Sequence, residues 1–187
     1  MVKYHPMIDT SIYYITFLRH GESVRNAEDR FQGHADFPLT EKGCAQARTL
    51  ADRWRDEGVT FDQCIASPLL RTGLTPEQAA QVAPRPDFTT PYTHYGETGE
   101  SRWEVSLRAG QAIQHILDRR PGGYLVAAHG GVLNMALYAI LGIPVQADST
   151  GPRFMFHNTT FATFAYELGH HNWRMLNFDD RRHWKED

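Results

Sequence analysis

Apolar runs of strand length alternate with segments of helical period along most of the chain. The strand candidates are 12–18, 61–66 and 124–128, and the helical segments are 41–57, a stretch after 71, 101–119 and 131–141. Two further apolar runs, 154–166 and 173–178, follow with a tight connection at 169–172. This order predicts an α/β fold: a three-layer α/β/α sandwich with a mostly parallel central sheet and a C-terminal β-hairpin.

The helical segments carry recognisable start signals. Thr40 is the expected N-cap of the first helix, and Ser101 with Glu104 forms a capping box for the third. For the second helix, Thr75 as N-cap followed by Pro76 is the expected start. The apolar faces are predicted to be Cys44, Ala47, Leu50, Ala51 and Trp54 in 41–57, and Val105, Ala109, Ala112, Ile113 and Ile116 in 101–119.

Each of the first three strand candidates ends near a cationic or imidazole side chain. Arg19 and His20 follow the first, Arg71 comes shortly after the second, and His129 follows the third. Ligands of open α/β sheets bind beyond the carboxyl ends of the strands, and guanidinium groups pair well with phosphate oxygens. The helix that starts after His129 could also direct its N-terminus at an anion. The pattern therefore predicts a phosphate-handling site.

Composition narrows the class of protein. The 187 residues, 41% of them hydrophobic, suit a single domain spanning 1–187. The net charge of −3 and the absence of a long basic run argue against nucleic acid or an anionic membrane surface as the main partner. The first residues lack the apolar core of a signal peptide, so a cytoplasmic location is expected.

Cysteine and histidine positions give no sign of a metal centre. Cys44 and Cys64 have no metal-ligand spacing and are expected to be reduced. The tandem His170 and His171 lack a carboxylate or thiol at ligand spacing. We expect no metal and no cofactor. The tail 179–187 mixes both charge signs and is expected to be a solvated end.

Four ordered sequence blocks resemble one known family. Leu-Arg-His-Gly-Glu-Ser stands at 18–23, followed by Asn26, Phe-Gln-Gly-His-Ala-Asp-Phe-Pro-Leu-Thr-Glu-Lys-Gly at 31–43, Ser-Pro-Leu-Leu-Arg at 67–71, and His-Gly at 129–130. In order and spacing these blocks are similar to the phosphoglycerate-mutase-like histidine phosphatase superfamily. The resemblance predicts that superfamily's fold and a site for phosphomonoesters.

The resemblance also implies roles for individual residues. His20 would form a phosphohistidine, while Arg19, Arg71 and His129 hold the phosphoryl group. Asn26 would add a hydrogen bond to the phosphate, and the positions near the substrate would be Gln32, Gly33 and Gly130. From the chemistry alone, a neutral His20 can attack phosphorus if its other ring nitrogen donates to a carbonyl.

The general acid has two candidates. Family members carry a glutamate some distance after the arginine that corresponds to Arg71, and a separate Gly-Glu-Ser that opens a helix. Here both patterns fall within 95–104, so Glu97 is the first choice and Glu100, with Arg108 at the family's spacing, the substitute.

In larger members of that superfamily an insertion and a long tail cover the site, whereas the connection in 95–104 is short. This comparison implies an open pocket, which favours a phosphatase over a mutase. The expected substrate is a small phosphorylated metabolite. Two alternatives stay open: a phosphoglycerate-type mutase, and a phosphate-binding regulatory module without turnover. A homodimer is compatible with each of these three functions.

Overall fold

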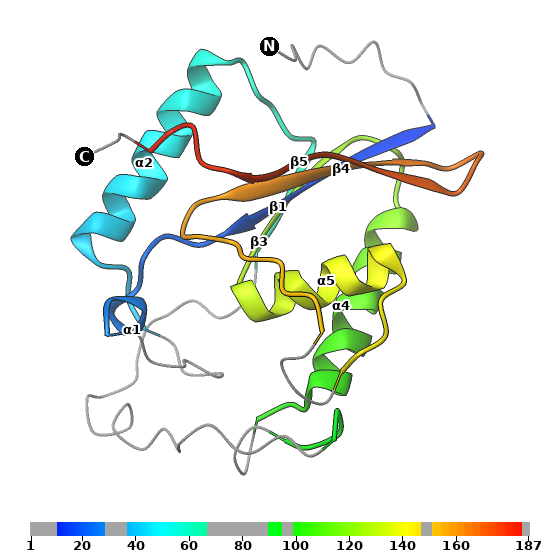
Figure 1. The fold of residues 1–187 in the computed structure, drawn as a ribbon. Coiled ribbons are helices and arrows are strands. Elements are labelled where there is room, and N and C mark those ends of the chain that lie inside the picture. The colour runs from blue at the N-terminus through cyan, green and yellow to red at the C-terminus, as the bar shows by residue number, and fades with distance from the viewer. Residues whose placement is uncertain (1–10, 29–36, 67–89, 95–98, 147–150, 185–187) are drawn as a thin grey trace.

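The computed structural model describes residues 11–28, 37–66, 90–94, 99–146 and 151–184, and within them a five-stranded sheet lies between layers of helices (Figure 1). The strands are β1 Ile12–Arg19, β2 Gln63–Ala66, β3 Gly123–Ala128, β4 Phe161–Glu167 and β5 Asn172–Asp180. The helices are α1 Val24–Ala27, α2 Glu41–Asp56, α4 Arg102–Leu117 and α5 Gly130–Leu141. Figure 1 shows α2 on one side of the sheet and α4 with α5 on the other.

The strand order is β2-β3-β1-β4-β5, with a parallel core and an antiparallel end. β1 pairs in parallel with β3, and β3 with β2, whereas β4 runs antiparallel to both β1 and β5. The predicted α/β fold with its C-terminal hairpin is confirmed. In the β1–β3 register Arg19 lies opposite Ala128, so the residues that follow these strands emerge side by side.

The predicted helix starts are confirmed where the structure describes them. Thr40 Oγ1 accepts a hydrogen bond from Gly43 N at 3.0 Å. Ser101 and Glu104 form a reciprocal capping box at the start of α4. The predicted start of the second helix, Thr75 and Pro76, lies outside the described residues.

The predicted apolar faces are only partly buried. Leu50, Ala109, Ile113 and Ile116 are buried, whereas Ala47, Ala51 and Ala112 are exposed. On α2 the buried side is shifted from Ala47 and Ala51 toward Arg53, whose side chain is only 11% exposed and is paired with Asp180. Helical period alone does not reveal that a charged residue faces inward.

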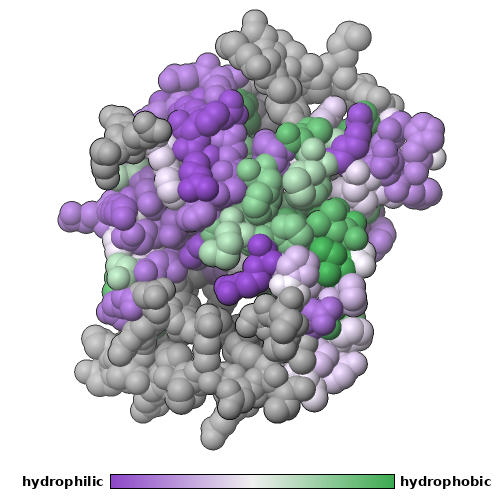
Figure 2. Space-filling view, in the orientation of Figure 1, coloured by the Kyte–Doolittle hydropathy of each residue, from purple (hydrophilic) through white to green (hydrophobic). Residues whose placement is uncertain are grey.

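The main hydrophobic core lies on the side of the sheet that α4 and α5 cover. Tyr13, Phe17, Tyr124, Tyr138 and Phe164 are all almost fully buried there. Burying such a side chain contributes roughly 1.5–3 kcal/mol to the free energy of folding, so this core stabilises the strands that precede the predicted site residues. Figure 2 shows a mostly hydrophilic surface over α2 and hydrophobic residues gathered between α5 and the C-terminal hairpin.

Two predictions about the C-terminal part are wrong. The run 154–166 is a strand only from Phe161 onward, because the chain before it turns back toward the end of β1 with Thr159 at φ 59°. Within 179–184 the tail is not a fully solvated end, because Asp180 and His183 are only 9% and 5% exposed. Asp180 is buried because Arg53 neutralises its charge at 2.6 Å.

No helix in the described ranges combines the length and the apolar character that crossing a membrane requires.

Candidate active site

Four predicted site residues come together where β1 and β3 end. His20 N donates to Ala128 O at 3.2 Å, which extends the parallel pairing by one bond. The rings of His20 and His129 lie 4.9 Å apart between centroids and are inclined by 62°. A Cβ on Gly130 would lie 3.7 Å from Arg19 Nε, so the start of α5 borders the guanidinium group. Of the other predicted residues, Asn26 is described by the structure, whereas Arg71, Glu97, Gln32 and Gly33 lie outside the described residues.

The imidazole of His20 is held in one tautomer. Its Nδ1 lies 2.6 Å from Gly21 O. A carbonyl oxygen only accepts hydrogen bonds, so Nδ1 carries the proton in the neutral ring. Nε2 then keeps its lone pair, which is the state that a nucleophilic histidine needs.

Arg19 is oriented by the main chain. Its Nη1 donates to Phe156 O at 2.5 Å, in the connection that precedes β4. One edge of the guanidinium group is thereby fixed to the protein while the group borders Gly130. A guanidinium held in this way is suited to pairing with an anion at the start of α5.

The side-chain amide of Asn26 has a fixed orientation. Its Oδ1 accepts from Ser23 N at 3.2 Å, from Ser23 Oγ at 2.9 Å and from Asn158 Nδ2 at 3.2 Å. A backbone N–H can only donate, so the oxygen must face Ser23. The amide nitrogen of Asn26 is then the end that can donate to a phosphate.

Sequence reasoning missed Asn158. Its Nδ2 donates to His20 O at 3.2 Å and to Asn26 Oδ1 at 3.2 Å, so one amide joins two of the predicted site residues. The one signal in the sequence was the polar run His157 to Thr160, which interrupts the apolar pattern between Phe156 and Phe161.

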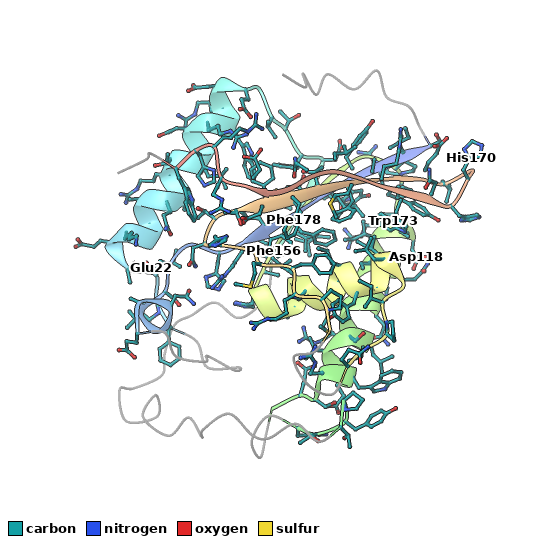
Figure 3. All side chains as sticks on the ribbon, in the orientation of Figure 1. Glu22, Asp118, Phe156, His170, Trp173 and Phe178 are labelled. Carbon is teal, nitrogen blue, oxygen red and sulfur yellow. The ribbon has the colours of Figure 1, made fainter. Side chains whose placement is uncertain are left out.

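The motif at 18–23 also holds the site against α2. A Cβ on Gly21 would lie 2.5 Å from Gly43 O, and one on Gly43 only 2.0 Å from Glu22 O. The Glu22 carboxylate accepts from Thr40 Oγ1 at 2.9 Å and pairs with Lys42 at 3.1 Å. Gly21, Gly43 and Glu22 therefore fix the loop after His20 to the start of the helix, a role that the sequence alone did not reveal. In Figure 3 Glu22 lies in this loop, far from His170 at the tip of the hairpin.

Glu100, the substitute general acid, is engaged in an ion pair. Arg108 donates to both of its carboxylate oxygens, at 2.8 and 2.6 Å. The hydrogen bond to Glu100 raises the pKa of Arg108, as expected for a charged pair. A general acid must carry a proton on one of those oxygens, so this arrangement disfavours Glu100.

The neighbouring Glu104 also remains ionised. The backbone N–H and the hydroxyl of Ser101 donate to it and lower its pKa. Within the described ranges the structure contains no group of three or more metal-ligating side chains.

Comparisons with known proteins identify the family of this chain. The chain matches the family model of the histidine phosphatase superfamily (branch 1) over residues 15–91 and 74–180. It is 32% identical to the probable phosphoglycerate mutase GpmB of Cronobacter sakazakii, and the alignment covers 82% of this chain and 85% of that protein.

Two solved structures have the same fold. YhfR of Bacillus stearothermophilus superimposes with a TM-score of 0.70 at 24% identity, covering 91% of this chain and 98% of that one. Phosphoserine phosphatase of Entamoeba histolytica, in complex with 3-phosphoglyceric acid, gives a TM-score of 0.67 at 20% identity with the same coverage. On the strength of the family match, which extends over most of its length, this chain belongs to the histidine phosphatase superfamily.

Proposed function

We propose that this protein is a phosphomonoesterase that hydrolyses a small phosphorylated metabolite through a phosphohistidine on His20. The observation that carries the proposal is the hydrogen bond from His20 Nδ1 to Gly21 O, because it assigns the proton of the neutral ring to Nδ1 and makes Nε2 the nucleophilic nitrogen. The ring of His129 at 4.9 Å supports it further, since a second imidazole beside the nucleophile can donate to a phosphoryl oxygen when protonated.

The proposed reaction has two steps. His20 Nε2 attacks phosphorus, the bond from phosphorus to the ester oxygen breaks, and Glu97 gives its proton to the departing alcohol. Water then attacks the phosphohistidine and loses a proton to Glu97, the P–N bond breaks, and inorganic phosphate leaves. Arg19, Arg71 and His129 would neutralise the phosphoryl oxygens throughout both steps.

Glu97 is proposed as the acid because the alternative is already engaged. The bidentate bond from Arg108 favours the ionised form of Glu100. General acid catalysis contributes about 10²- to 10⁴-fold, so Glu97→Gln should lower the turnover of esters with poor leaving groups by that factor. Glu100→Gln should have a much smaller effect.

Names of the similar proteins suggest which esters to test first. One relative is called a phosphoglycerate mutase, and one solved structure is a phosphoserine phosphatase with 3-phosphoglyceric acid. Small phosphorylated acids therefore belong in the substrate panel, beside sugar and nucleotide phosphates. Asn26 Nδ2 and the guanidinium of Arg19 would bind the phosphate shared by all of them.

The deciding experiment measures phosphate release from an aryl phosphate and from this panel, with a chelator present. Wild type should turn over at least one ester, His20→Ala should be inactive, and His170→Ala should match wild type because His170 lies 76% exposed in the hairpin connection. Full activity of His20→Ala would refute the mechanism. Transfer between phosphoglycerates with little phosphate release would select a mutase, and vanadate binding without turnover would select the regulatory module.

A further inference from the structure

The turn before β4 holds the main chain of the nucleophile segment. Thr159 N donates to Arg19 O at 3.0 Å and to His20 O at 3.2 Å, and Arg19 N donates to Thr160 O at 3.1 Å. The Asn158 side chain donates to His20 O as well, at 3.2 Å. His20 O thus accepts from two groups of one turn, and this fixes the peptide from which the imidazole projects.

Thr159 adopts an unfavourable backbone conformation to make these bonds. Its φ is 59°, in the left-handed region that a β-branched residue rarely enters. Such a conformation is strained and persists only where the surroundings impose it. Outliers of this kind concentrate at functional sites.

The C-terminal segment supplies those surroundings. Thr159 Oγ1 donates its one proton to Asn158 O at 2.7 Å, so it accepts from its other neighbours. These are His183 Nε2 at 3.0 Å and Trp184 Nε1 at 3.3 Å. Thr159 and His183 are 2% and 5% exposed, so little water competes for these bonds.

The segment is itself attached to the body of the protein. Two guanidinium nitrogens of Arg53 in α2 donate to the Asp180 carboxylate, at 2.6 and 3.1 Å. Burial, followed by the charge of Arg53, lowers the pKa of His183, which keeps the ring neutral with Nε2 as the donor. A continuous set of contacts therefore leads from α2 through the tail to Thr159.

We infer that Asn158 and Thr159 are positioning residues for the nucleophile, and that His183 and Trp184 lock them in place. The inference rests on the proposed function, because it assigns these residues a role in presenting His20 Nε2 to phosphorus. They touch the main chain of Arg19 and His20, the side chain of Asn26 or each other rather than the substrate. The guanidinium of Arg19 is held separately, by Phe156 O. Asn158 also donates to Asn26 Oδ1, but Ser23 N and Ser23 Oγ hold the same oxygen, so phosphate binding should survive the loss of Asn158.

Two variants test the inference, with one matched control. Asn158→Ala removes the amide that donates to His20 O, at a half-buried position where the fold should tolerate the change. His183→Phe keeps a ring of similar size but removes the donor to Thr159 Oγ1. His170→Phe makes the same substitution at the exposed tip of the hairpin (Figure 3).

Two quantities are measured in each variant. One is kcat and KM for the aryl phosphate, and the other is the pair of His20 ring ¹⁵N signals in NMR spectra, which report the tautomer. In Asn158→Ala and His183→Phe we expect kcat to fall about 10- to 100-fold with KM nearly unchanged, as for a small misplacement of a reacting group. The His20 signals should also move toward a mixture of tautomers, whereas His170→Phe should match wild type in both quantities.

The inference requires that Asn158→Ala change both kcat and the His20 nitrogen signals. If either kcat or the His20 nitrogen signals are unchanged in Asn158→Ala, the inference is overturned, whatever the melting temperature of His183→Phe. Failure of the proposed function has a different signature, because His20→Ala would then retain phosphatase activity or wild type would have none. The tautomer measurement needs no turnover and separates the two cases.

Discussion

The buried ion pair between Arg53 of α2 and Asp180 at the end of β5 allows a sharp test of how the tail is held. The side chains are 11% and 6% exposed, and the closest N–O distance is 2.6 Å. Arg182 also pairs with Asp180 at 2.6 Å, but its own side chain is 72% exposed. Asp180→Asn keeps the shape of the side chain and removes the buried partner of Arg53, which then keeps only its ion pair with the more exposed Glu57 at 2.9 Å.

The expected cost follows from burial. Removing one partner of a buried ion pair costs about 3–5 kcal/mol, because the other charge loses the buried partner that offsets its desolvation. For a chain of this size 1 kcal/mol corresponds to about 2–4 °C in melting temperature, so Asp180→Asn should melt about 6–20 °C lower than wild type.

Measurements at several pH values refine the test. Burial alone would raise the pKa of Asp180, but the hydrogen bonds from Arg53 and Arg182 outweigh it and hold the pKa well below 3.8. The contribution to stability is therefore complete above pH 3.8 and is lost as the pH falls below that value. The difference between wild type and Asp180→Asn should narrow in the same range.

Urea denaturation of wild type, Asp180→Asn and a matched control measures the free energy of unfolding. The control is Asp52→Asn, which removes the same charge from the pair with Arg55 on α2, where the side chains are 62% and 73% exposed. That change should cost less than about 1 kcal/mol. Equal losses in the two variants at pH 7 would refute the claim that burial gives the Asp180 pair its strength.

Three further predictions concern the site and its supports. Gly43→Ala places a Cβ 2.0 Å from Glu22 O, so it should lower the free energy of unfolding by at least about 1–3 kcal/mol and remove much of the activity. The control Gly110→Ala has open space at its Cβ and should raise the melting temperature slightly. Equal effects of the two changes in urea denaturation would contradict this prediction. Burial lowers the pKa of His183, so the unfolded chain binds a proton at this residue more readily than the folded protein does, and stability should fall as the pH drops below 6.5. In His183→Phe the melting temperature should fall less steeply over that range. An unchanged slope would disprove the assignment. Asn26→Ala should lower kcat/KM about 10- to 100-fold, as for loss of a hydrogen bond to a charged phosphate, and an unchanged value would exclude Asn26 from phosphate binding.

Local features of the fold could be predicted from the sequence. The caps at Thr40 and Ser101 depend on residues three positions apart, and the structure contains both. The meeting of His20 and His129 also followed from the sequence, because parallel strands bring their carboxyl ends to one edge. These features could be predicted because they depend only on short sequence spacing and on the direction of the strands.

The supports of the site could not be predicted in the same way. Arg53 and Asp180 are distant in the sequence, and each belongs to a segment whose charges looked solvent-facing. Thr159 is β-branched and stands beside an apolar run, which favours a strand, yet its hydrogen bonds to the ends of β1 impose a left-handed conformation. Tertiary contacts determine the burial of Arg53 and Asp180 and the backbone conformation of Thr159, whereas the residue types alone favour exposed charges and a strand.

The central place of β1 in the sheet has a consequence for synthesis of the chain on the ribosome. Among the strands that the structure describes, β1 is translated first, yet both of its partners, β3 and β4, belong to the later part of the polypeptide. At about 5–20 residues per second, the ribosome needs on the order of ten seconds to synthesise the chain from β1 to β4, and β1 cannot pair with β4 during that time. The nascent protein should therefore bind chaperones through β1, and folding should be slow for its size because its pairings span such long loops.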